Sequence, residues 1–268
     1  MDKPADTPTV EDVWRTFLVT GYATREFRYR HWFGLLPAHP RCRFCNAPFR
    51  GLGGTVVRLL YDRRPSRLNP RLCNFCENFA REYQGGAEVE LSMLFVDVRG
   101  STSLAEKLSP TEFSRIINRF YSIASEVLIR TDALIDKLVG DQVTGLYVPG
   151  FAGPQHARRA VEAAQEILRI TGHGQPGGPW IAAGAGVHTD VAFVGAVGTK
   201  EGTVDITVLG DAANIAARLS SNAKQGEILI SESAYAAAGL QFEQAERRTL
   251  ELKGKSAPVN VRVLTDYS

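Results

Sequence analysis

Two hydrophobic periods alternate along most of the chain, one typical of helices and one typical of strands. Helical spacing of apolar residues occurs at 111–130, 154–170 and 211–223. Strand-like apolar runs occur at 89–98, 133–148, 180–189, 191–198, 226–231 and 247–264. A Gly-Asp pair interrupts the run at 133–148 and predicts a β-hairpin, and 247–264 predicts a closing pair of strands. Because helices and strands are interleaved and at least one hairpin is present, we expect an α+β fold rather than a purely parallel sheet.

The N-terminal part of the chain follows a different pattern. Residues 9–20 predict a short helix with Thr9 as its N-cap. The segment REYQGG at 81–86 is typical of a helix end followed by a glycine stop, and we expect that helix over about 77–84. We therefore predict an N-terminal module over residues 1–84 and a second, larger domain over residues 85–268.

Charge is distributed unevenly, although the net charge is only +2. Between Gly21 and Phe75 the chain has eleven arginines and no lysine, and Glu26 and Asp62 are the only acids. Such asymmetry favours an anionic partner of this N-terminal region, such as nucleic acid, a membrane surface or a regulator. A solvated arginine-rich surface, or arginines paired with acids of the other domain, explains the same composition, so both interpretations stay open.

Two features missing from the sequence, a membrane-spanning run and a signal-peptide pattern, predict the cellular compartment. No apolar run approaches the roughly 20 residues that span a bilayer. The N-terminal residues MDKPADTPTV are polar and do not have the basic and then apolar order of a signal peptide. We therefore expect a cytoplasmic protein, and in that reducing compartment the four cysteines are expected as metal ligands rather than as disulfides.

The cysteines form two pairs, CRFC at 42–45 and CNFC at 73–76. A two-residue gap lets both thiolates of a pair face one ion, and four thiolates make a closed, structural Zn²⁺ site. We therefore expect one Zn²⁺ in a zinc-ribbon-like module, held by Cys42, Cys45, Cys73 and Cys76. An iron–sulfur cluster, redox thiols and plain buried cysteines are the alternatives. The module is small, so a metal is expected to help it fold, and a regulatory or dimer-stabilising role is suggested.

Two acidic residues stand where apolar strands are expected to end. Asp97 lies at the end of LFVDV, and Asp141 follows Gly140 at the tip of the predicted hairpin. Carboxylates in such places suit Mg²⁺ or Mn²⁺, and two metals about 3.5–4 Å apart can activate an attacking oxygen and stabilise a leaving one. The segment RGSTS at 99–103 opens a predicted helix, whose exposed amides favour phosphate. These features favour phosphoryl chemistry, although an aspartate after a glycine is also common in ordinary turns.

Four sequence motifs together point to one protein family: LFVDVRGSTSLAEKL, KLVGDQV, TVLGDAANIAARL and LELKGKSAPVNVRVL. In order and spacing they resemble the catalytic domain of class III adenylate and guanylate cyclases, over about residues 86–266. The resemblance implies a ferredoxin-like α+β domain. It also implies that Asp97 and Asp141 hold two Mg²⁺ or Mn²⁺ ions together with the Val98 carbonyl. The turn at Arg99–Thr102 would then lie under the triphosphate, with Gly100, Ser101 and Thr102 as its substrate-binding residues.

The base-reading positions of the family fall on Lys137 and Thr207. By the resemblance, Lys137 donates to adenine N1, where guanylate cyclases carry an acid. Many adenylate cyclases have an aspartate at the position of Thr207, so this chain departs from that pattern and is similar to the class IIIb subgroup. A threonine hydroxyl can also accept a hydrogen bond from the adenine amine. ATP is therefore the expected substrate, and a cyclase for GTP or a pyrimidine nucleotide is the alternative.

Asn214 and Arg218 lie four residues apart in DAANIAARL, which places them on one helical face with Asp211 as the expected N-cap. A surface face with an ordinary ion pair is the plain interpretation. The resemblance instead implies that Asn214 orients the ribose and that Arg218 stabilises charge on the transferred phosphate, a role suited to a planar, permanently charged guanidinium. Lys253 matches a lysine that contacts the terminal phosphates.

The implied reaction is attack of the ribose 3′-oxygen on the α-phosphorus, with pyrophosphate as the leaving group. The resemblance also implies a head-to-tail homodimer, in which the two acids come from one subunit and Lys137, Thr207, Asn214 and Arg218 come from the other. From a different class, a nucleic-acid-binding zinc module with an inactive cyclase-like domain is the competing hypothesis.

Overall fold

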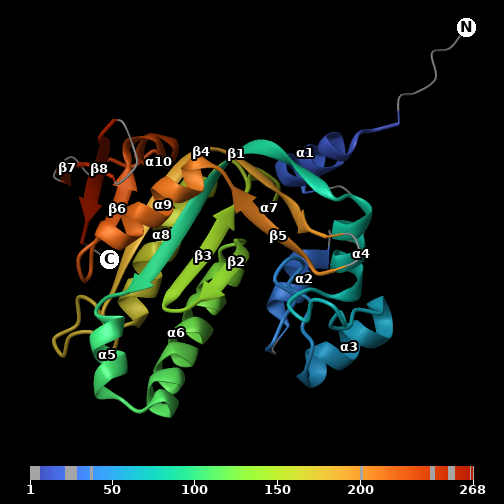
Figure 1. Cartoon of the computed structure of the whole chain (residues 1–268), viewed down its shortest axis with the longest axis horizontal. Coiled ribbons are helices and arrows are strands. Elements are labelled where there is room, and N and C mark those ends of the chain that lie inside the picture. Colours follow the sequence, from blue (N-terminus) through green and yellow to red (C-terminus); the bar gives the residue numbers. More distant parts are fainter. Residues whose placement is uncertain are drawn as a thin grey trace, which may run out of the picture. The chain divides into compact units, whose positions relative to one another are not determined.

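The structure is a computed structural model that describes residues 7–21, 29–36, 39–199, 202–241, 245–252, 257–265 and 267. The chain divides into two compact units. We call the first the module unit (Met1–Val89 and Phe193–Val208) and the second the sheet unit (Glu90–Ala192 and Leu209–Ser268). Strands β1 (Gly85–Val98) and β4 (Ala183–Gly198) contribute residues to both units, and Figure 1 labels the elements along the chain.

The sheet unit holds most of the regular structure. Its other strands are β2 (Leu134–Val139), β3 (Gln142–Tyr147), β6 (Ile228–Ser231), β7 (Glu246–Leu250) and β8 (Val259–Leu264). Its helices are α5 (Ser101–Lys107), α6 (Pro110–Arg130), α7 (Pro149–Ala152), α8 (His156–Ile170), α9 (Asp211–Asn222) and α10 (Glu232–Ala237). The strand order is β2-β3-β1-β4-β6-β8-β7, and β5 (Val204–Leu209) pairs with β4 outside this path.

Strand pairing is mixed, as the sequence predicts. Strand β3 is antiparallel to both β1 and β2, and β8 is antiparallel to both β6 and β7. Strands β4 and β6 are parallel. The predicted hairpin and the predicted closing pair of strands are therefore both present, and the α+β class is confirmed.

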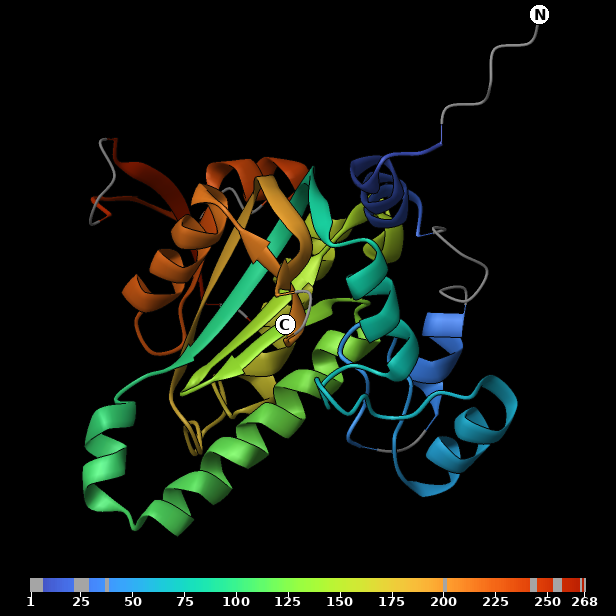
Figure 2. The same ribbon diagram turned by 45° about the vertical axis from the view of Figure 1, so that its right-hand side comes forward.

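Helices cover both faces of the sheet near β6. Ile228 and Ile230 belong to the main core, to which α6 and α8 contribute their buried faces. Leu229 belongs instead to a second cluster, which includes Leu219 of α9. Because successive side chains of a strand point to opposite faces, α9 lies across the sheet from α6 and α8. Figure 2 shows the long α6 alongside the strands.

Close packing between α9 and β4 depends on glycine. A Cβ atom at Gly186 would lie 2.3 Å from the Ser220 backbone nitrogen and 2.7 Å from the Ala216 carbonyl oxygen. A Cβ at Gly184 would lie 2.9 Å from the Lys224 carbonyl oxygen. The two glycines therefore allow the helix that carries Asn214 and Arg218 to lie directly on the sheet.

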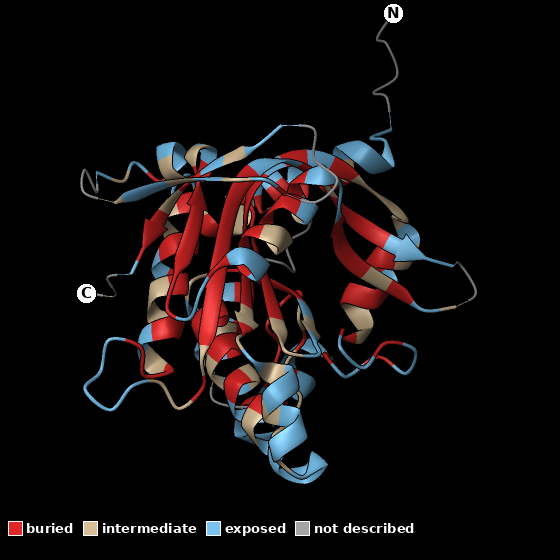
Figure 3. Ribbon diagram, turned by 60° about the vertical axis from the view of Figure 1, so that its left-hand side comes forward, coloured by how far each residue is buried: buried red, intermediate tan, exposed pale blue. Residues whose placement is uncertain are grey.

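Helix α6 begins at a capping box. The Ser109 hydroxyl accepts a hydrogen bond from the Glu112 backbone N–H over 3.3 Å, and the Glu112 carboxylate accepts one from the Ser109 N–H over 3.0 Å. Pro110 occupies the first turn, where its missing N–H has no cost. The first buried residue of α6 is Ile117, and α5 has none, so this end of the unit is largely exposed (Figure 3).

The module unit contains α1 (Val10–Thr20), α2 (Arg30–Leu35), α3 (Gly51–Tyr61) and α4 (Asn74–Glu82). Thr9 is the N-cap of α1, as predicted, and forms a capping box with Asp12. An aromatic cluster joins α1 to α4: the Trp14 and Phe79 ring centroids are 5.2 Å apart, and those of Phe17 and Phe44 are 5.0 Å apart. These rings form a small core beside the cysteines.

Several arginines of the N-terminal stretch are used inside the module unit. Arg30 is buried, and its Nε donates to the Phe44 carbonyl oxygen over 3.0 Å. Arg41 donates to the Phe33 carbonyl oxygen over 2.6 Å. The Arg63 guanidinium lies 3.7 Å from the centre of the Phe75 ring. The arginine-rich composition therefore reflects, in part, cross-links between loops that a small apolar core holds only weakly.

One prediction of strand boundaries is wrong. The sequence predicts separate strands at 180–189 and 191–198, but the structure has one strand there, β4, which runs through Asp190. The Asp190 carboxylate accepts a hydrogen bond from the Val191 backbone N–H over 2.7 Å, so the polar residue stays within the strand. Pairing with strands on both sides decides the backbone path there, which a local pattern does not register.

Two helix ends also differ from the sequence prediction. Helix α4 begins at Asn74 and ends at Glu82, and no glycine stops it, because Gly85 and Gly86 start β1. The N-cap of α9 is Gly210 rather than Asp211, which is the first helical residue. Gly210 has a φ of +126°, a conformation that favours glycine, while Asp211 still complements the positive end of the helix.

None of the described helices is both long enough and apolar enough to cross a membrane.

Candidate active site

Asp97 and Asp141 come together where β1 ends and the β2–β3 hairpin turns. In the pairing of β1 with β3, Asp97 lies opposite Gln142, the residue after Asp141. The Val98 backbone N–H donates to the Asp141 carbonyl oxygen over 3.1 Å. Gly140 has a φ of +63°, and this left-handed conformation closes the tight turn. The acids singled out in the sequence are therefore neighbours, although they are far apart along the chain.

The surroundings of these acids are polar and charged. Burial raises the pKa of the Asp97 carboxyl, the Arg99 guanidinium beside it lowers that pKa, and the Asp141 carboxylate raises it. Arg99 forms an ion pair with Asp97, and the Ser101 hydroxyl donates a hydrogen bond to the Asp141 carboxylate. Two half-buried carboxylates this close repel each other, and oxygen ligands of this kind suit Mg²⁺ or Mn²⁺. The donor set therefore fits a divalent cation.

The predicted phosphate-binding turn follows directly after these acids. Gly100 has a φ of +68° and is the N-cap of α5, which begins at Ser101. A Cβ at Gly100 would meet nothing within 4 Å, so glycine is needed for its backbone conformation and not for space. Thr102 is exposed, and Ser101 is bonded to Asp141. The three residues thus share one edge of the sheet unit with both acids.

Arg99 has a structural role that the sequence analysis did not predict. Its guanidinium pairs with Asp97 and also donates to the Ser221 carbonyl oxygen at the end of α9, over 2.9 Å. The Arg99 backbone N–H donates to the Ala182 carbonyl oxygen over 2.8 Å. Arg99 therefore ties the acid-bearing end of β1 to the C-terminal end of α9. The position of the arginine, two residues after a strand-end aspartate, was the only signal in the sequence.

Lys137 lies on β2 and faces the same side of the sheet as Asp97. It is opposite Thr144 of β3, and Thr144 is opposite Phe95 of β1, so the three side chains form one row. Asp97, two residues beyond Phe95, points to the same face. The Lys137 side chain is 52% exposed, and its Nζ lies 3.9 Å from a carboxylate oxygen of Asp136. Its ammonium group is thus accessible to a ligand on this face.

The other predicted substrate positions lie on different elements. Asn214 and Arg218 lie on one side of α9; Asn214 is exposed and Arg218 partly exposed, while Ile215 and Leu219 are buried in the second cluster. Thr207 lies on β5 in the module unit and is buried. Lys253, the position expected to contact the terminal phosphates, falls outside the described residues.

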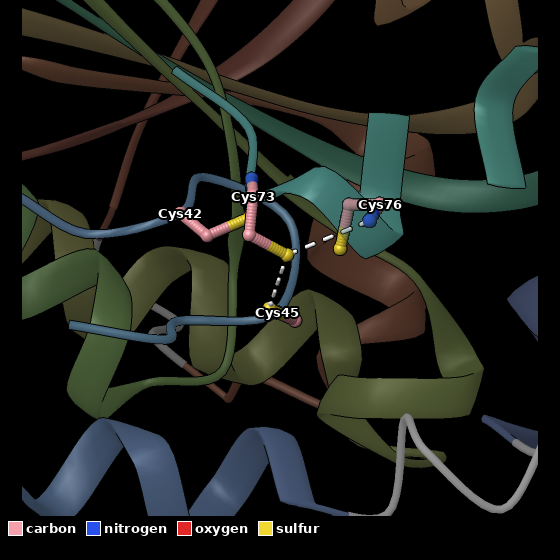
Figure 4. Close-up of side chains that lie close together, drawn as sticks. All are labelled: Cys42, Cys45, Cys73 and Cys76. Carbon is pink, nitrogen blue, oxygen red and sulfur yellow. Dashed lines mark hydrogen bonds between the residues drawn. The ribbon is translucent and has the colours of Figure 1, made fainter. Parts of the chain in front are cut away.

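The four cysteines form a compact cluster in the module unit. The sulfur atoms of Cys42, Cys45, Cys73 and Cys76 all lie within 4.8 Å of one another (Figure 4). All four residues are buried. None is in a disulfide. The Cys45 and Cys73 sulfurs are 3.7 Å apart. A tetrahedral Zn²⁺ with Zn–S bonds of about 2.3 Å places its sulfurs about 3.8 Å apart, so the Cys45–Cys73 distance and the four-thiol donor set fit that ion.

Burial and hydrogen bonding shift the pKa values of these thiols in opposite directions. Burial raises the pKa of Cys45 and of Cys76, whereas hydrogen bonds from the neighbouring cysteines lower the pKa of Cys73. The Cys73 backbone N–H donates to the Cys42 sulfur over 3.2 Å, and the Cys76 N–H donates to the Cys73 sulfur over 3.5 Å. Several buried thiolates stay deprotonated together only beside a positive charge.

Comparison with known proteins covers the part of the chain that holds the acids, the hairpin and α9. Residues 85–265 match the family model described as "Adenylate and Guanylate cyclase catalytic domain". An adenylate cyclase of Anabaena cylindrica is 33% identical over 149 residues, which cover 53% of this chain and 30% of that protein. Adenylate cyclase 1 of Rhizobium meliloti is 28% identical over 179 residues, covering 64% of this chain and 27% of that protein. The matches span about a third or less of these relatives.

Solved structures give the same result. The guanylyl cyclase Cya2 aligns with a TM-score of 0.58 and 29% identity, over 67% of this chain and 93% of that one. The adenylyl cyclase CyaB from P. aeruginosa aligns with a TM-score of 0.56 and 27% identity, over 66% of this chain and 94% of that one. The family match extends over more than half of the chain, and the fold agrees with it. The chain therefore belongs to the family of adenylate and guanylate cyclase catalytic domains.

Proposed function

We propose that this protein converts ATP to 3′,5′-cyclic AMP and pyrophosphate in a site built at the interface of a homodimer. The observation that carries the proposal is the convergence of Asp97 and Asp141 at one strand end, with Ser101 bonded to Asp141. Relatives that are named adenylate cyclases support the choice of ATP. In the reaction a bond forms between the ribose 3′-oxygen and the α-phosphorus, and the bond from that phosphorus to the bridging oxygen of pyrophosphate breaks.

Asp97, Asp141 and the Val98 carbonyl are the proposed ligands of two Mg²⁺ or Mn²⁺ ions. When bound, such ions lower the pKa of the ribose hydroxyl and offset the charge of the triphosphate. The turn at Gly100–Thr102 presents backbone N–H groups beside the acids, and we assign it to the phosphates. Lys253 is assigned to the terminal phosphates by its place in the motif LELKGKS.

Base recognition is assigned to Lys137 and Thr207. The exposed ammonium of Lys137 can donate to adenine N1, and the Thr207 hydroxyl can accept from the adenine amine. Asn214 is assigned to the ribose, and Arg218 to the charge that develops on the transferred phosphate. Their exposure on α9 supports this assignment, because neither side chain is used to fill the core of the sheet unit.

A direct test is to incubate the purified protein with each of ATP, GTP, CTP and UTP in the presence of Mn²⁺ or Mg²⁺. We expect cyclic AMP and an equal amount of pyrophosphate. Formation of no cyclic nucleotide from any substrate would refute the cyclase proposal, and preferential formation of another cyclic nucleotide would refute the choice of ATP.

The base-reading assignment has its own test. The double variant Lys137→Glu with Thr207→Cys is expected to shift preference from ATP towards GTP, because the purine-facing donor is replaced by an acceptor. Arg58→Glu, a charge reversal on the exposed side of α3, is the matched control and should leave the preference unchanged. An unchanged ATP preference in the double variant contradicts the roles given to Lys137 and Thr207.

For the module unit we propose one structural Zn²⁺ held by Cys42, Cys45, Cys73 and Cys76. The sulfur spacing and the burial of all four residues support it. Elemental analysis should find about one zinc per chain in the purified protein and none in the variant with all four cysteines replaced by serine. Iron with inorganic sulfide would instead support an iron–sulfur cluster and contradict the zinc assignment.

A further inference from the structure

Among the described strands, β5 has a single pairing partner. It pairs with β4 and lies outside the main strand order of the sheet. It nevertheless carries Thr207, the residue that we assign to the nucleotide base. The module unit joins Met1–Val89 to Phe193–Val208, so this strand and the four cysteines belong to the same compact unit. Contacts between the cysteine loops and β5 therefore bear on where Thr207 lies.

Asn69 makes the most direct of these contacts. Its side-chain amide nitrogen donates to the Val204 carbonyl oxygen at the start of β5 over 3.0 Å, and lies 3.5 Å from a carboxylate oxygen of Asp205. Asn69 is buried, with 5% of its surface exposed. Its side-chain oxygen accepts from the Arg71 backbone N–H over 3.1 Å, which fixes the orientation of the amide. Contacts within its own loop therefore orient the Asn69 amide, independently of β5.

The loop that carries Asn69 is closed by residues next to a cysteine of the cluster. The Ser66 backbone N–H donates to the Leu72 carbonyl oxygen over 2.9 Å, and the Leu72 N–H donates to the Asn69 carbonyl oxygen over 2.9 Å. Pro65 and Cys73 form an isolated β-bridge at the base of this loop. The base of the loop that carries Asn69 is therefore formed directly beside Cys73, one of the four clustered cysteines.

A second connection runs through α4. Glu77, which follows Cys76, accepts a hydrogen bond from Ser66 and forms an ion pair with Arg81 at 2.7 Å. Arg81 donates to the Gly202 carbonyl oxygen, two residues before β5 begins. The Gln84 side chain donates to the Gly198 carbonyl oxygen at the end of β4 over 2.6 Å. Both ends of the β4–β5 connection are therefore held by residues of α4 or by the residues just after it.

We propose that the four-cysteine module positions β5, and through it Thr207, for the base of the nucleotide. Asn69, Arg81 and Gln84 are positioning residues in this arrangement, since none of them is assigned to the substrate. The part that concerns the nucleotide rests on the proposed function. The part that concerns the strand rests only on contacts within the module unit, and it can be tested in the absence of substrate.

The test compares wild-type protein with Asn69→Ala, which removes the donor to Val204 and leaves all four cysteines intact. Asn78→Ala is the matched control, because Asn78 is exposed on α4. Zinc content is measured first and is expected to be equal in all three proteins. Hydrogen exchange of the β5 amides, without nucleotide, then reports on the strand. The KM, the kcat and the preference among the four NTPs report on the site.

For Asn69→Ala we expect β5 amides to exchange roughly three- to tenfold faster, in line with the loss of one hydrogen bond. We also expect the KM for ATP to rise by a similar factor and the preference for ATP to weaken, with a smaller change in kcat. Loss of folded protein alone would instead lower kcat and leave the KM and the preference unchanged. Asn78→Ala should match wild type in every measurement.

Two outcomes overturn the proposal. Unchanged exchange in β5 at equal zinc content contradicts the positioning of the strand, whether or not the protein is a cyclase. Faster exchange with unchanged KM and unchanged NTP preference contradicts the link to the base. If wild type itself turns over no NTP, the cyclase proposal fails, and the exchange comparison still decides the strand. Gln84→Ala, at a half-buried position, supplies a milder variant with the same expectations if Asn69→Ala does not fold.

Discussion

At the scale of single residues, the proposed metal site depends on two carboxylates that converge at one strand end. Asp97 ends an apolar strand, and Asp141 follows the turn glycine of a hairpin. Neither place favours an acid for packing, since a half-buried carboxylate loses hydration unless a cation or donors surround it. Arg99 and Ser101 supply part of that compensation in the protein itself. Divalent cations supply the rest in the proposed reaction.

The first prediction concerns Asp97 itself. Asp97→Asn keeps the size of the side chain but removes a charged metal ligand, so cyclase activity is expected to fall by at least about 100-fold. Asp62→Asn is the matched control, because Asp62 is exposed and has a φ of +48°, which asparagine tolerates. Initial rates of cyclic nucleotide formation measure both variants. A loss of less than tenfold in Asp97→Asn would contradict the metal assignment.

At the scale of elements, helix α9 has to lie directly on the sheet to present Asn214 and Arg218. The alanine-rich sequence of α9 and the glycines of β4 allow this close approach. Arg99 then joins the last turn of α9 to the strand that carries Asp97. One helix thus connects the proposed transition-state residues with the proposed metal ligands of the same chain.

The second prediction tests that packing. Gly186→Ala places a Cβ atom 2.3 Å from the Ser220 backbone nitrogen, so α9 has to shift and the free energy of unfolding is expected to fall by roughly 1–3 kcal/mol or more. Gly177→Ala is the control, since a Cβ there meets nothing within 4 Å and its φ is not in the left-handed region. Urea unfolding measures both. Equal stability of the two variants would mean that α9 does not pack on β4 as described.

Particular residues show which features of the fold and the site could be predicted from the sequence. The helix N-cap at Thr9, the hairpin at Gly140–Asp141 and the i, i+4 face of α9 follow from local patterns, and the structure contains them. The convergence of Asp97 with Asp141 needed four collinear motifs in addition. The Arg99 contact with Ser221 joins positions 122 residues apart, and no local pattern encodes such a contact. The continuity of β4 through Asp190 also depends on neighbouring strands.

At the scale of the whole molecule, the proposed site is composite, and one sequence contains the residues assigned to both of its halves. We assign Asp97 and Asp141 to one half, and Lys137, Thr207, Asn214 and Arg218 to the other. The proposed two-fold homodimer would bring each half of one subunit to the opposite half of its partner, because a C2 interface repeats every contact. Two complete sites then arise from a single sequence, and an isolated subunit is expected to be inactive.

The third prediction concerns stability of the folded chain against acid. His156 is buried, and its Nδ1 lies 2.9 Å from the Ser92 hydroxyl oxygen. Burial lowers the pKa of His156, and the charge of Glu90 opposes this only in part. The unfolded chain therefore binds the proton more readily, so stability is lost as the pH falls through about 6.5 towards the lower folded pKa.

Replacing this histidine should weaken that pH dependence. His156→Gln is expected to lose less unfolding free energy between about pH 7 and about pH 5 than wild type does, because glutamine does not titrate. Urea unfolding at several pH values measures it, with His31→Gln, at an exposed position, as the control. A pH dependence in His156→Gln equal to that of wild type would show that another group dominates.

The most direct test of the whole account is a mixing experiment with two inactive variants. Asp97→Asn lacks the acid half of the site, and Arg218→Ala lacks the transition-state half, so each protein alone should form almost no cyclic nucleotide. Mixed in equal amounts and allowed to exchange subunits, they should recover about a quarter of wild-type activity, since half of the dimers are mixed and each mixed dimer has one intact site. No recovery, with subunit exchange confirmed, would contradict a site shared between two copies of this chain.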